Sequence, residues 1–329
     1  MALVNPSTTL TEIVTTTLRN RTGMLADNIT KNNALLNRLR KKGKVKTVSG
    51  GRTIVQELEY AENGTYKRYA GYEQLNIAPS DVFTGAEFNY AQAAVAVSIS
   101  GLEMIQNAGE DAIIDLLESR IANAEKTITN NVAIDCYSAG TADGGRQIGG
   151  LQALISTTPT SGVVGGIDPS TTAGTFWQNI AFSSVTNGGG AATAANIQSY
   201  MNRVYVQIVR GADRVDLIPA DNNYWRLYLE SLQSIQRIAS DEMAQAGFSS
   251  LKYMDADVVL DGGVGGGAPT NSMYFLNTDY IYFRPHVDRF FAPLGDDRFA
   301  VNQDAMVKLI GFAGNMTISN RKLQAVLSA

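Results

Sequence analysis

The segment QELEYAENGTYKRYAGYEQLNI, residues 56–77, constrains the fold of this chain more than any other. Its side chains alternate in the manner of a β-hairpin, and the Asn-Gly pair at residues 63–64 favours a two-residue turn. The segment holds four tyrosines and several charged residues, but too few aliphatic side chains to build a core of its own. An isolated two-stranded ribbon is only marginally stable in water. We therefore expect the ribbon to complete its burial on another molecule.

A turn at residues 63–64 also sets the predicted register of this ribbon. It places Glu59 opposite Arg68, an opposite-charge pair, and Leu58 opposite Tyr69, an apolar pair. With limbs of about 20 residues, the ribbon would reach roughly 60 Å. Tyrosine and arginine are residue types that anchor protein interfaces. The residues predicted to contact another molecule are Leu58, Tyr60, Tyr66, Arg68, Tyr69 and Tyr72.

Hydrophobic periodicity predicts the elements on either side of the ribbon. An apolar stripe favours a helix over residues 26–42. Alternation predicts β-structure from 44 to 100, and its last strand, residues 93–100, returns the chain to the body. Residues 110–138 form the clearest helix, roughly 40 Å long. Its apolar stripe consists of Ile113, Leu117, Ile121, Ala124, Ile128 and Val132.

The second half of the chain mixes helices with strands. Residues 139–192 are rich in glycine, serine and threonine, which predicts loops. A helix over 194–209 and a strand over 214–220 follow, and Asp221 is a suitable N-cap for the next helix. From Leu251 onward the pattern is β. The chain is therefore predicted to be α+β, and 329 residues suffice for one large domain or two ordinary ones.

Positive charge is concentrated before the ribbon. Residues 28–56 contain eight lysines and arginines and no acid, so a net charge of −4 leaves −12 for the rest of the chain. This segment is either a solvated helix face or a surface that neutralises nucleic-acid phosphates without reading sequence. No tyrosine or phenylalanine lies between Lys31 and Arg52, so base stacking is not indicated. The candidate contact residues are Arg38, Arg40, Lys41, Lys42, Lys44 and Lys46.

No motif in the sequence indicates catalysis. Gly263, Gly265 and Ala268 fit a dinucleotide-binding pattern, which leaves an α/β oxidoreductase as an alternative. That pattern requires a helix to follow it, whereas TNSMYFL favours a strand, so a loop between two strands is the better interpretation. His286, the one histidine, and Cys136, the one cysteine, are expected to be structural. We predict no cofactor and no metal site.

The cysteine content and the N-terminal sequence also indicate where the protein is made. One cysteine excludes an intrachain disulfide. The start MALVNPSTTL lacks the features of a signal peptide, and no window approaches the roughly 18 apolar residues of a membrane span. We expect a protein made in a reducing cytoplasm, without a membrane partner.

The order of these parts resembles the major capsid protein of tailed bacteriophages. That family has the Hong Kong 97-type capsid fold, which is also seen in encapsulins. Three stretches carry the resemblance: SGGRTIVQELEYAENGTYKRYAGYEQLNI, AAVAVSISGLEMIQNAGEDAIIDLLESRIANAEKT and DLIPADNNYWRLYLESLQSIQRI. It covers nearly the whole chain and is strongest from Ser49 to Thr129.

The resemblance implies an α+β fold with named parts. These are an N-terminal arm with a short helix (1–43), an extension loop formed by a long β-hairpin (44–100), a peripheral domain (101–193) with its spine helix (110–138), an axial domain (194–295) and return strands of the peripheral domain (296–329). The extension loop would lie over a neighbouring subunit, and the basic arm would lie toward the packaged genome.

The resemblance also implies a structural protein and no enzyme. The chain would be a major capsid subunit that assembles with itself, in hexamers and pentamers, into the icosahedral head of a tailed phage. The head would enclose double-stranded DNA, bound without sequence preference. Portal, separate scaffolding and cement proteins are further expected partners. The protein would be found in the virion, after assembly in the host bacterial cytoplasm. An encapsulin-type compartment shell is the alternative within the fold.

Overall fold

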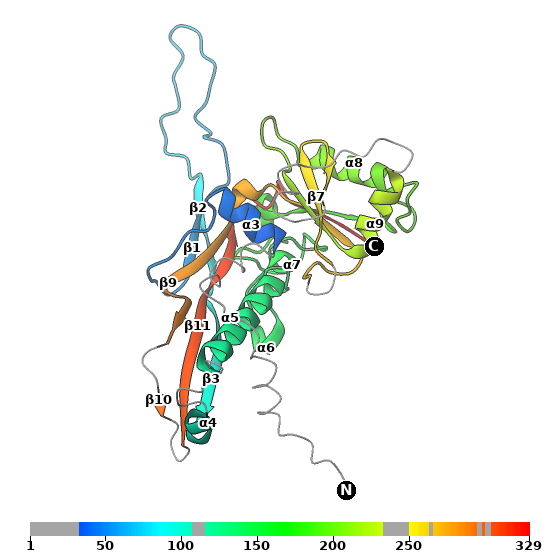
Figure 1. Cartoon of the computed structure of the whole chain (residues 1–329). Helices are drawn as coiled ribbons and strands as arrows, with labels where there is room; N and C mark the ends of the chain where they lie inside the picture. The colour runs from blue at the N-terminus through cyan, green and yellow to red at the C-terminus, as the bar shows by residue number, and fades with distance from the viewer. Residues whose placement is uncertain (1–32, 107–115, 233–249, 263–265, 295–297, 300–303) are drawn as a thin grey trace.

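The computed structural model describes six stretches of the chain, residues 33–106, 116–232, 250–262, 266–294, 298–299 and 304–329. They form an α+β architecture, as predicted, with two sheets and a separate two-stranded ribbon. In Figure 1 the ribbon's loop projects at one end, and β3, β11 and α4 extend toward the other.

A four-stranded antiparallel sheet forms the elongated part of the molecule. Its central strand, β11, pairs with each of the other three strands. The strands are β3 (Ala91–Ser100), β9 (Ile281–Pro293), β10 (Arg298–Phe299) and β11 (Ala305–Ile318). The pairing of β3 with β11 confirms that residues 93–100 return the chain to the body. The short helix α4 (Gly101–Gln106) follows β3.

The long helix α5 (Leu116–Asp135) runs along this sheet (Figure 1). The described part of its predicted stripe is buried, namely Ala124, Ile128 and Val132. Ala124 packs with Val97 of β3 and Ile310 of β11 in a small apolar cluster. The stripe therefore fixes the helix on the sheet, as the periodicity predicted.

A six-stranded mixed sheet forms the second part of the fold, in the order β4-β12-β8-β5-β7-β6. The strands are β4 (Ile180–Ser183), β5 (Leu217–Ala220), β6 (Ser250–Tyr253), β7 (Ala256–Leu260), β8 (Ser272–Phe275) and β12 (Ala325–Ser328). Strand β12 lies between β4, which is parallel to it, and β8, which is antiparallel. The sheet thus includes strands from outside residues 194–295.

Helices α8 (Ile197–Ile208) and α9 (Asn222–Ser231) pack with this sheet in one apolar core. Asp221 caps α9 as predicted, because its Oδ1 accepts a hydrogen bond of 2.9 Å from the backbone nitrogen of Tyr224. Tyr224 and Tyr228 of α9 are buried. Helix α8 confirms the predicted helix over 194–209 to within three residues at its start.

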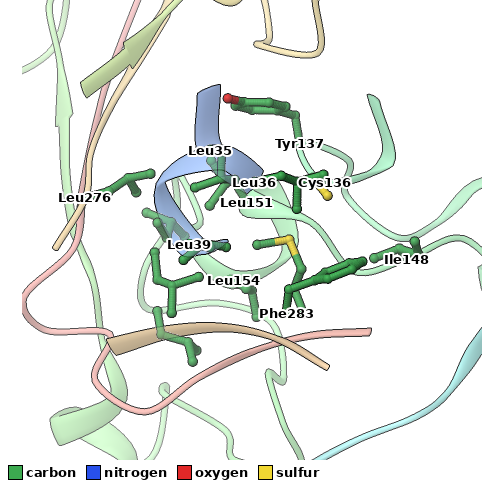
Figure 2. Close-up of a cluster of buried hydrophobic side chains, with 14 of the residues drawn as sticks. Leu35, Leu36, Leu39, Cys136, Tyr137, Ile148, Leu151, Leu154, Leu276 and Phe283 are labelled. Atoms are coloured by element: carbon green, nitrogen blue, oxygen red, sulfur yellow. The ribbon is translucent and has the colours of Figure 1, made fainter. Parts of the chain in front are cut away.

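A larger core joins the N-terminal segment to the rest of the molecule (Figure 2). Helix α3 (Ala34–Lys41) buries Leu35, Leu36 and Leu39 against the end of α5 and helix α7 (Leu151–Leu154). Its N-cap is Asn33, whose side chain accepts from the nitrogen of Leu36. The short elements η1 (Thr172–Trp177), η2 (Thr278–Tyr280) and α6 (Ala142–Gly145) complete the described structure.

Four predicted features lie wholly or partly outside the described residues. These are the arm and helix start before residue 33, the start of the long helix before residue 116, the segment 233–249 after α9, and residues 263–265 of the glycine-rich stretch.

The ribbon forms, but its predicted register is wrong. Strand β1 (Ile54–Glu59) pairs with β2 (Phe83–Phe88), so Glu59 lies opposite Phe83 rather than Arg68. Leu58 lies opposite Thr84 rather than Tyr69. The Asn63 side chain instead accepts from the backbone nitrogen and hydroxyl of Thr65, which makes a local turn in place of a hairpin.

Residues 60–82 therefore form a long irregular loop in place of paired limbs. The backbone nitrogen of Gly64 donates to the hydroxyl of Ser80 at 3.0 Å, which holds the base of the loop together. An exposed ion pair of 2.9 Å between Lys67 and Glu73 lies nearer its tip. Because this loop has few apolar pairs across it, pairing stops where the buried face of the ribbon ends.

One buried charge connects segments far apart in the sequence. Arg321 is 1% exposed, and its guanidinium donates to the carbonyl oxygens of Leu154 and Trp177 and to Asn179 Oδ1, at 2.7, 2.8 and 3.0 Å. It also lies 5.8 Å from the centroid of the Trp177 ring. Burial lowers the pKa of Arg321 to about 10, so the side chain is still charged at neutral pH.

We expect Arg321→Ala to lower the free energy of unfolding by about 3 kcal/mol, because it leaves buried carbonyl oxygens without a donor. Urea unfolding of the isolated subunit would measure the loss. The neighbouring Lys322 is exposed, so Lys322→Ala should change the value by less than about 0.5 kcal/mol. Equal effects of the two substitutions would contradict the role of Arg321.

Candidate interaction surface

The two faces of the β1–β2 ribbon have different environments. Ile54, Leu58, Ala86 and Phe88 are buried in the core of the chain's own subunit. Leu58, one of the residues predicted to contact another molecule, is 3% exposed. The structure thus gives Leu58 a core position, and the surface available to a partner does not include it.

Tyr60 also packs within its own subunit. Its hydroxyl donates to the carbonyl oxygen of Asp81 at 2.8 Å, and its ring centroid lies 5.2 Å from that of Phe176. These contacts place Tyr60 at the point where the ribbon leaves the body. It supports the loop and is half-buried.

The other predicted contact residues lie on the projecting loop (Figure 1). Tyr66, Tyr69 and Tyr72 are 78%, 63% and 106% exposed. Arg68 is exposed beside them. Large aromatic side chains that are this exposed in a single chain make the loop a candidate surface for contact with another protein. We define the loop surface as Tyr66, Arg68, Tyr69 and Tyr72, together with the two residues described next.

Sequence reasoning missed two apolar residues of the same loop. Leu75 is 49% exposed and Ile77 is 92% exposed. Both belong to the segment 56–77 that predicted the ribbon. They could have been found as aliphatic residues in a part of that segment for which no pairing residue was predicted. They extend the apolar character of the loop surface along its second limb.

The basic segment divides into buried and exposed charges. Arg38 Nε lies 2.9 Å from Asp216 Oδ2, and the Arg38 side chain is 12% exposed. Lys42 Nζ lies 3.2 Å from the same carboxylate oxygen and 3.1 Å from Asp279. Arg38 and Lys42 thus help to hold α3 on the body.

Three of the remaining basic residues are exposed, namely Arg40 and Lys41 at the end of α3 and Lys46 after it. The Lys44 side chain is 21% exposed, which is less than that of Lys42. The Nζ atoms of Lys44 and Lys46 each lie 5.3 Å from the ring centroid of Tyr282. A surface that neutralises phosphates needs charges in contact with solvent, so the genome-contact prediction now rests on the exposed residues rather than on Arg38.

Asp216 is the centre of the buried ionic cluster. It accepts hydrogen bonds from the backbone nitrogen and hydroxyl of Thr278, at 2.8 and 2.6 Å, in addition to its contacts with Arg38 and Lys42. Burial alone would raise the pKa of Asp216. The Thr278 hydrogen bonds, the charge of Lys42 and the hydrogen bond from Arg38 outweigh it, so the pKa lies below its ordinary value.

The glycine-rich stretch does not open a helix. The described residues 266–276 lead directly into strand β8, and β7 ends at Leu260 before the stretch. A Cβ atom at Gly267 would lie 2.6 Å from the ring of Tyr137, so the glycine allows close packing. The helix N-terminus that a pyrophosphate would need is therefore not formed by these residues.

The remaining candidate reactive residues have structural surroundings. Cys136 is fully buried, and burial raises the pKa of its thiol. His286 Nδ1 accepts from the backbone nitrogen of Asp288 at 3.2 Å, and its ring contacts Tyr90. Within the described stretches, no group of three or more His, Cys, Asp or Glu residues could hold a metal ion. No helix in those stretches is long and apolar enough to cross a membrane.

Solved shell proteins have the same architecture over almost their whole length. The asymmetric unit of the cyanophage A-1(L) capsid matches with a TM-score of 0.65 at 17% identity, over 94% of this chain and 96% of that one. The capsid of an empty GTA particle matches with a TM-score of 0.57 at 10% identity, over 94% and 92%. The SrpI encapsulin complex from Synechococcus elongatus PCC 7942 matches with 0.55 at 8% identity, over 100% and 96%.

These matches confirm that the chain has the Hong Kong 97-type capsid fold that the sequence resemblance implied. No protein-family model matches the sequence, and no curated protein matches it. The likeness is therefore one of fold, at low sequence identity.

We expect Asp216→Asn to lower the free energy of unfolding by about 3 kcal/mol at pH 7, because Arg38 and Lys42 then lose their shared carboxylate. The folded pKa is depressed, so the carboxylate stabilises the fold above its unfolded pKa of about 3.9 and loses this effect as the pH falls through the folded pKa. Urea unfolding at pH 7 and at about pH 3 should show the wild-type advantage shrinking toward acid. Asp288→Asn is the control, because that side chain is 81% exposed. A difference that is the same at both pH values would contradict the pairing.

Proposed function

We propose that this chain is the major capsid subunit of a tailed bacteriophage with a double-stranded DNA genome. The observation that carries the proposal is the projecting loop, whose aromatic and aliphatic side chains are exposed in the single chain. The capsid fold supports the same conclusion, since the matched structures are shells.

The mechanism of such a subunit is geometric. Each copy lays its loop over an adjoining copy, and the apolar residues of the loop lose their contact with water there. A contact of this type joins two different surfaces, so it closes into rings when the rotation between copies allows. Hexameric and pentameric rings that share the same contact would build an icosahedral shell. The subunit is a structural protein in this proposal, and it needs no catalytic group.

An encapsulin-type compartment is the second candidate, because the SrpI encapsulin has the same fold. The higher TM-score to the cyanophage capsid, 0.65 against 0.55, favours the phage shell. The oxidoreductase alternative loses its basis, since the glycine-rich stretch joins two strands.

The packaged genome is the second proposed partner. Arg40 and Lys41 are exposed in a segment that contains no acid. They would neutralise phosphates without reading sequence. Portal, separate scaffolding and cement proteins are further proposed partners, and the virion is the proposed location after assembly in the host bacterial cytoplasm.

Expression of the chain alone, followed by size-exclusion chromatography and electron microscopy, tests the proposal. We expect megadalton particles with a closed outline. A chain that remains monomeric or forms a small oligomer, also when scaffolding protein is supplied, would contradict the shell. Protein cargo without nucleic acid in particles from the native source would favour the compartment instead.

The double variant Tyr66→Ala/Tyr69→Ala should fold as the wild type does but assemble poorly, with at least about tenfold fewer particles, because both rings are exposed in the single chain. Thermal unfolding and electron microscopy would measure the two effects. Val163→Ala is the matched control, since Val163 is an exposed apolar residue at 64% outside the loop. Normal shells from the double variant would argue against the loop as the contact.

The double variant Arg40→Gln/Lys41→Gln should leave shells intact but reduce the DNA that they retain. Each phosphate contact that is lost lowers the salt dependence of binding, by about 0.9 in the slope of log K against log salt concentration. Absorbance at 260 nm of purified particles over a range of salt concentrations would measure retention. Lys322→Gln serves as a control lysine from another surface. Unchanged retention at every salt concentration would count against a genome contact.

A further inference from the structure

The solvent face of the β1–β2 ribbon is acidic and partly apolar. The register places Val55 opposite Glu87, and Glu59 opposite Phe83, and these side chains are exposed. Glu57 lies between them, opposite Gly85. Val55 is 56% exposed and Phe83 is 70% exposed. We call the set Val55, Glu57, Glu59, Phe83 and Glu87 the acidic face.

The three carboxylates of the acidic face have no cationic partner among the described residues. Glu87 accepts from the hydroxyl of Thr53 at 3.3 Å, and this neutral contact leaves its charge uncompensated. Across the ribbon these carboxylates lie opposite Gly85, Phe83 and Val55, so no cross-strand pair compensates their charge. A ribbon with three of them favours a partner that supplies positive charge.

Such a positive surface exists on the same chain. Lys44 Nζ, Lys46 Nζ and Arg284 Cζ lie 5.3, 5.3 and 5.0 Å from the centroid of the Tyr282 ring. An aromatic face attracts cations, so this ring gathers three of them at one place. We call Lys44, Lys46, Tyr282 and Arg284 the cationic cluster.

The cationic cluster has less negative charge nearby than it has positive charge. Lys44 lies 3.8 Å from Asp279, which Lys42 also contacts at 3.1 Å. Within the described part of the chain, neither Lys46 nor Arg284 forms an ion pair. The cluster is suited to bind carboxylates.

The acidic face and Arg284 of the cationic cluster lie on opposite sides of strand β1. Arg284 donates to Gln56 at 2.9 Å, and Gln56 is on the buried face of β1, whereas the carboxylates point to the opposite face of the same strand. No ion pair among the described residues joins the two surfaces. A ribbon cannot turn both faces toward one cluster, so the acidic face cannot bind the cationic cluster of its own subunit.

We propose that the acidic face of one copy binds the cationic cluster of an adjoining copy, which makes the ribbon's solvent face an electrostatic and apolar contact between subunits. The proposal rests on the proposed shell function. Carboxylates meet lysines and arginine, and Val55 and Phe83 supply the apolar area at the contact. Such charge pairing selects the correct partner and register more than it adds affinity.

Charge reversal in a chain that carries both surfaces gives a direct test. We compare wild type, Glu57→Lys/Glu59→Lys, Lys44→Glu/Lys46→Glu and the chain with all four substitutions. The control is Glu230→Lys/Asp255→Lys, which has the same charge change as the first variant on α9 and the β6–β7 turn. Thermal unfolding reports folding, and size-exclusion chromatography with electron microscopy reports particles at about 0.1 M NaCl, where charges at short range are not fully screened.

We expect each double reversal to lower the particle yield about tenfold or more, and the fourfold variant to recover it, because opposite charges face one another again. The control should assemble. Normal particles from either double reversal, or no recovery in a folded fourfold variant, would overturn the pairing. Normal particles with less DNA from Lys44→Glu/Lys46→Glu would assign the cluster to phosphate instead. Particles absent from the wild type would contradict the shell itself, which is a separate failure.

A neutral variant keeps the test decisive if a reversed chain does not fold. Glu57→Gln/Glu59→Gln retains the shape of the acidic face and removes two charges. We expect its particle yield to fall and to depend less on salt than the wild-type yield between about 0.1 and 1 M NaCl. An unchanged salt dependence would overturn the proposal.

Discussion

A two-stranded ribbon has two faces and a connecting loop, and this chain can bury one of those faces. The inner face, with Ile54, Leu58 and Phe88, joins the same core as α3, the end of α5 and strands β9 and β11. The hydrophobic effect therefore fixes the base of the ribbon on its own subunit. The loop and the solvent face remain outside, where the same effect acts only when another molecule arrives. The ribbon is therefore attached to its own subunit at its base, while its loop is exposed to solvent.

The elements that depend on local sequence patterns could be predicted from the sequence. The stripe of α5, the N-cap of α9 and the return of β3 to the body were recoverable because each depends on residues within one or two turns or strands. The register of the ribbon was not. An Asn-Gly pair is compatible with a hairpin turn and with a local side-chain turn. The register is set instead by Ala86 and Phe88, which lie far along the chain and are buried in the core opposite β1.

The residues of the candidate site were also predictable only where their environment depends on nearby residues. The exposure of Tyr66, Tyr69 and Tyr72 could be predicted, because their segment has too few aliphatic side chains to bury them. The basic residues could not be sorted, because a lysine or arginine has the same appearance in a sequence whether it contacts solvent or a buried acid. Asp216 lies 178 residues from Arg38, so the pairing that gives Arg38 a structural position is a property of the folded chain alone.

The place of β12 between β4 and β8 in the six-stranded sheet has a consequence for synthesis. Its neighbour β4 precedes it by a long stretch of chain, and the hydrogen bond from Ser183 to Ala329 spans 146 residues. Until β12 has left the ribosome, β4 and β8 expose unpaired edges on either side of an empty position. A nascent chain thus cannot complete this sheet, and a truncated translation product would lack the strand that joins β4 to β8. Its unpaired edges would be open to pairing with other chains.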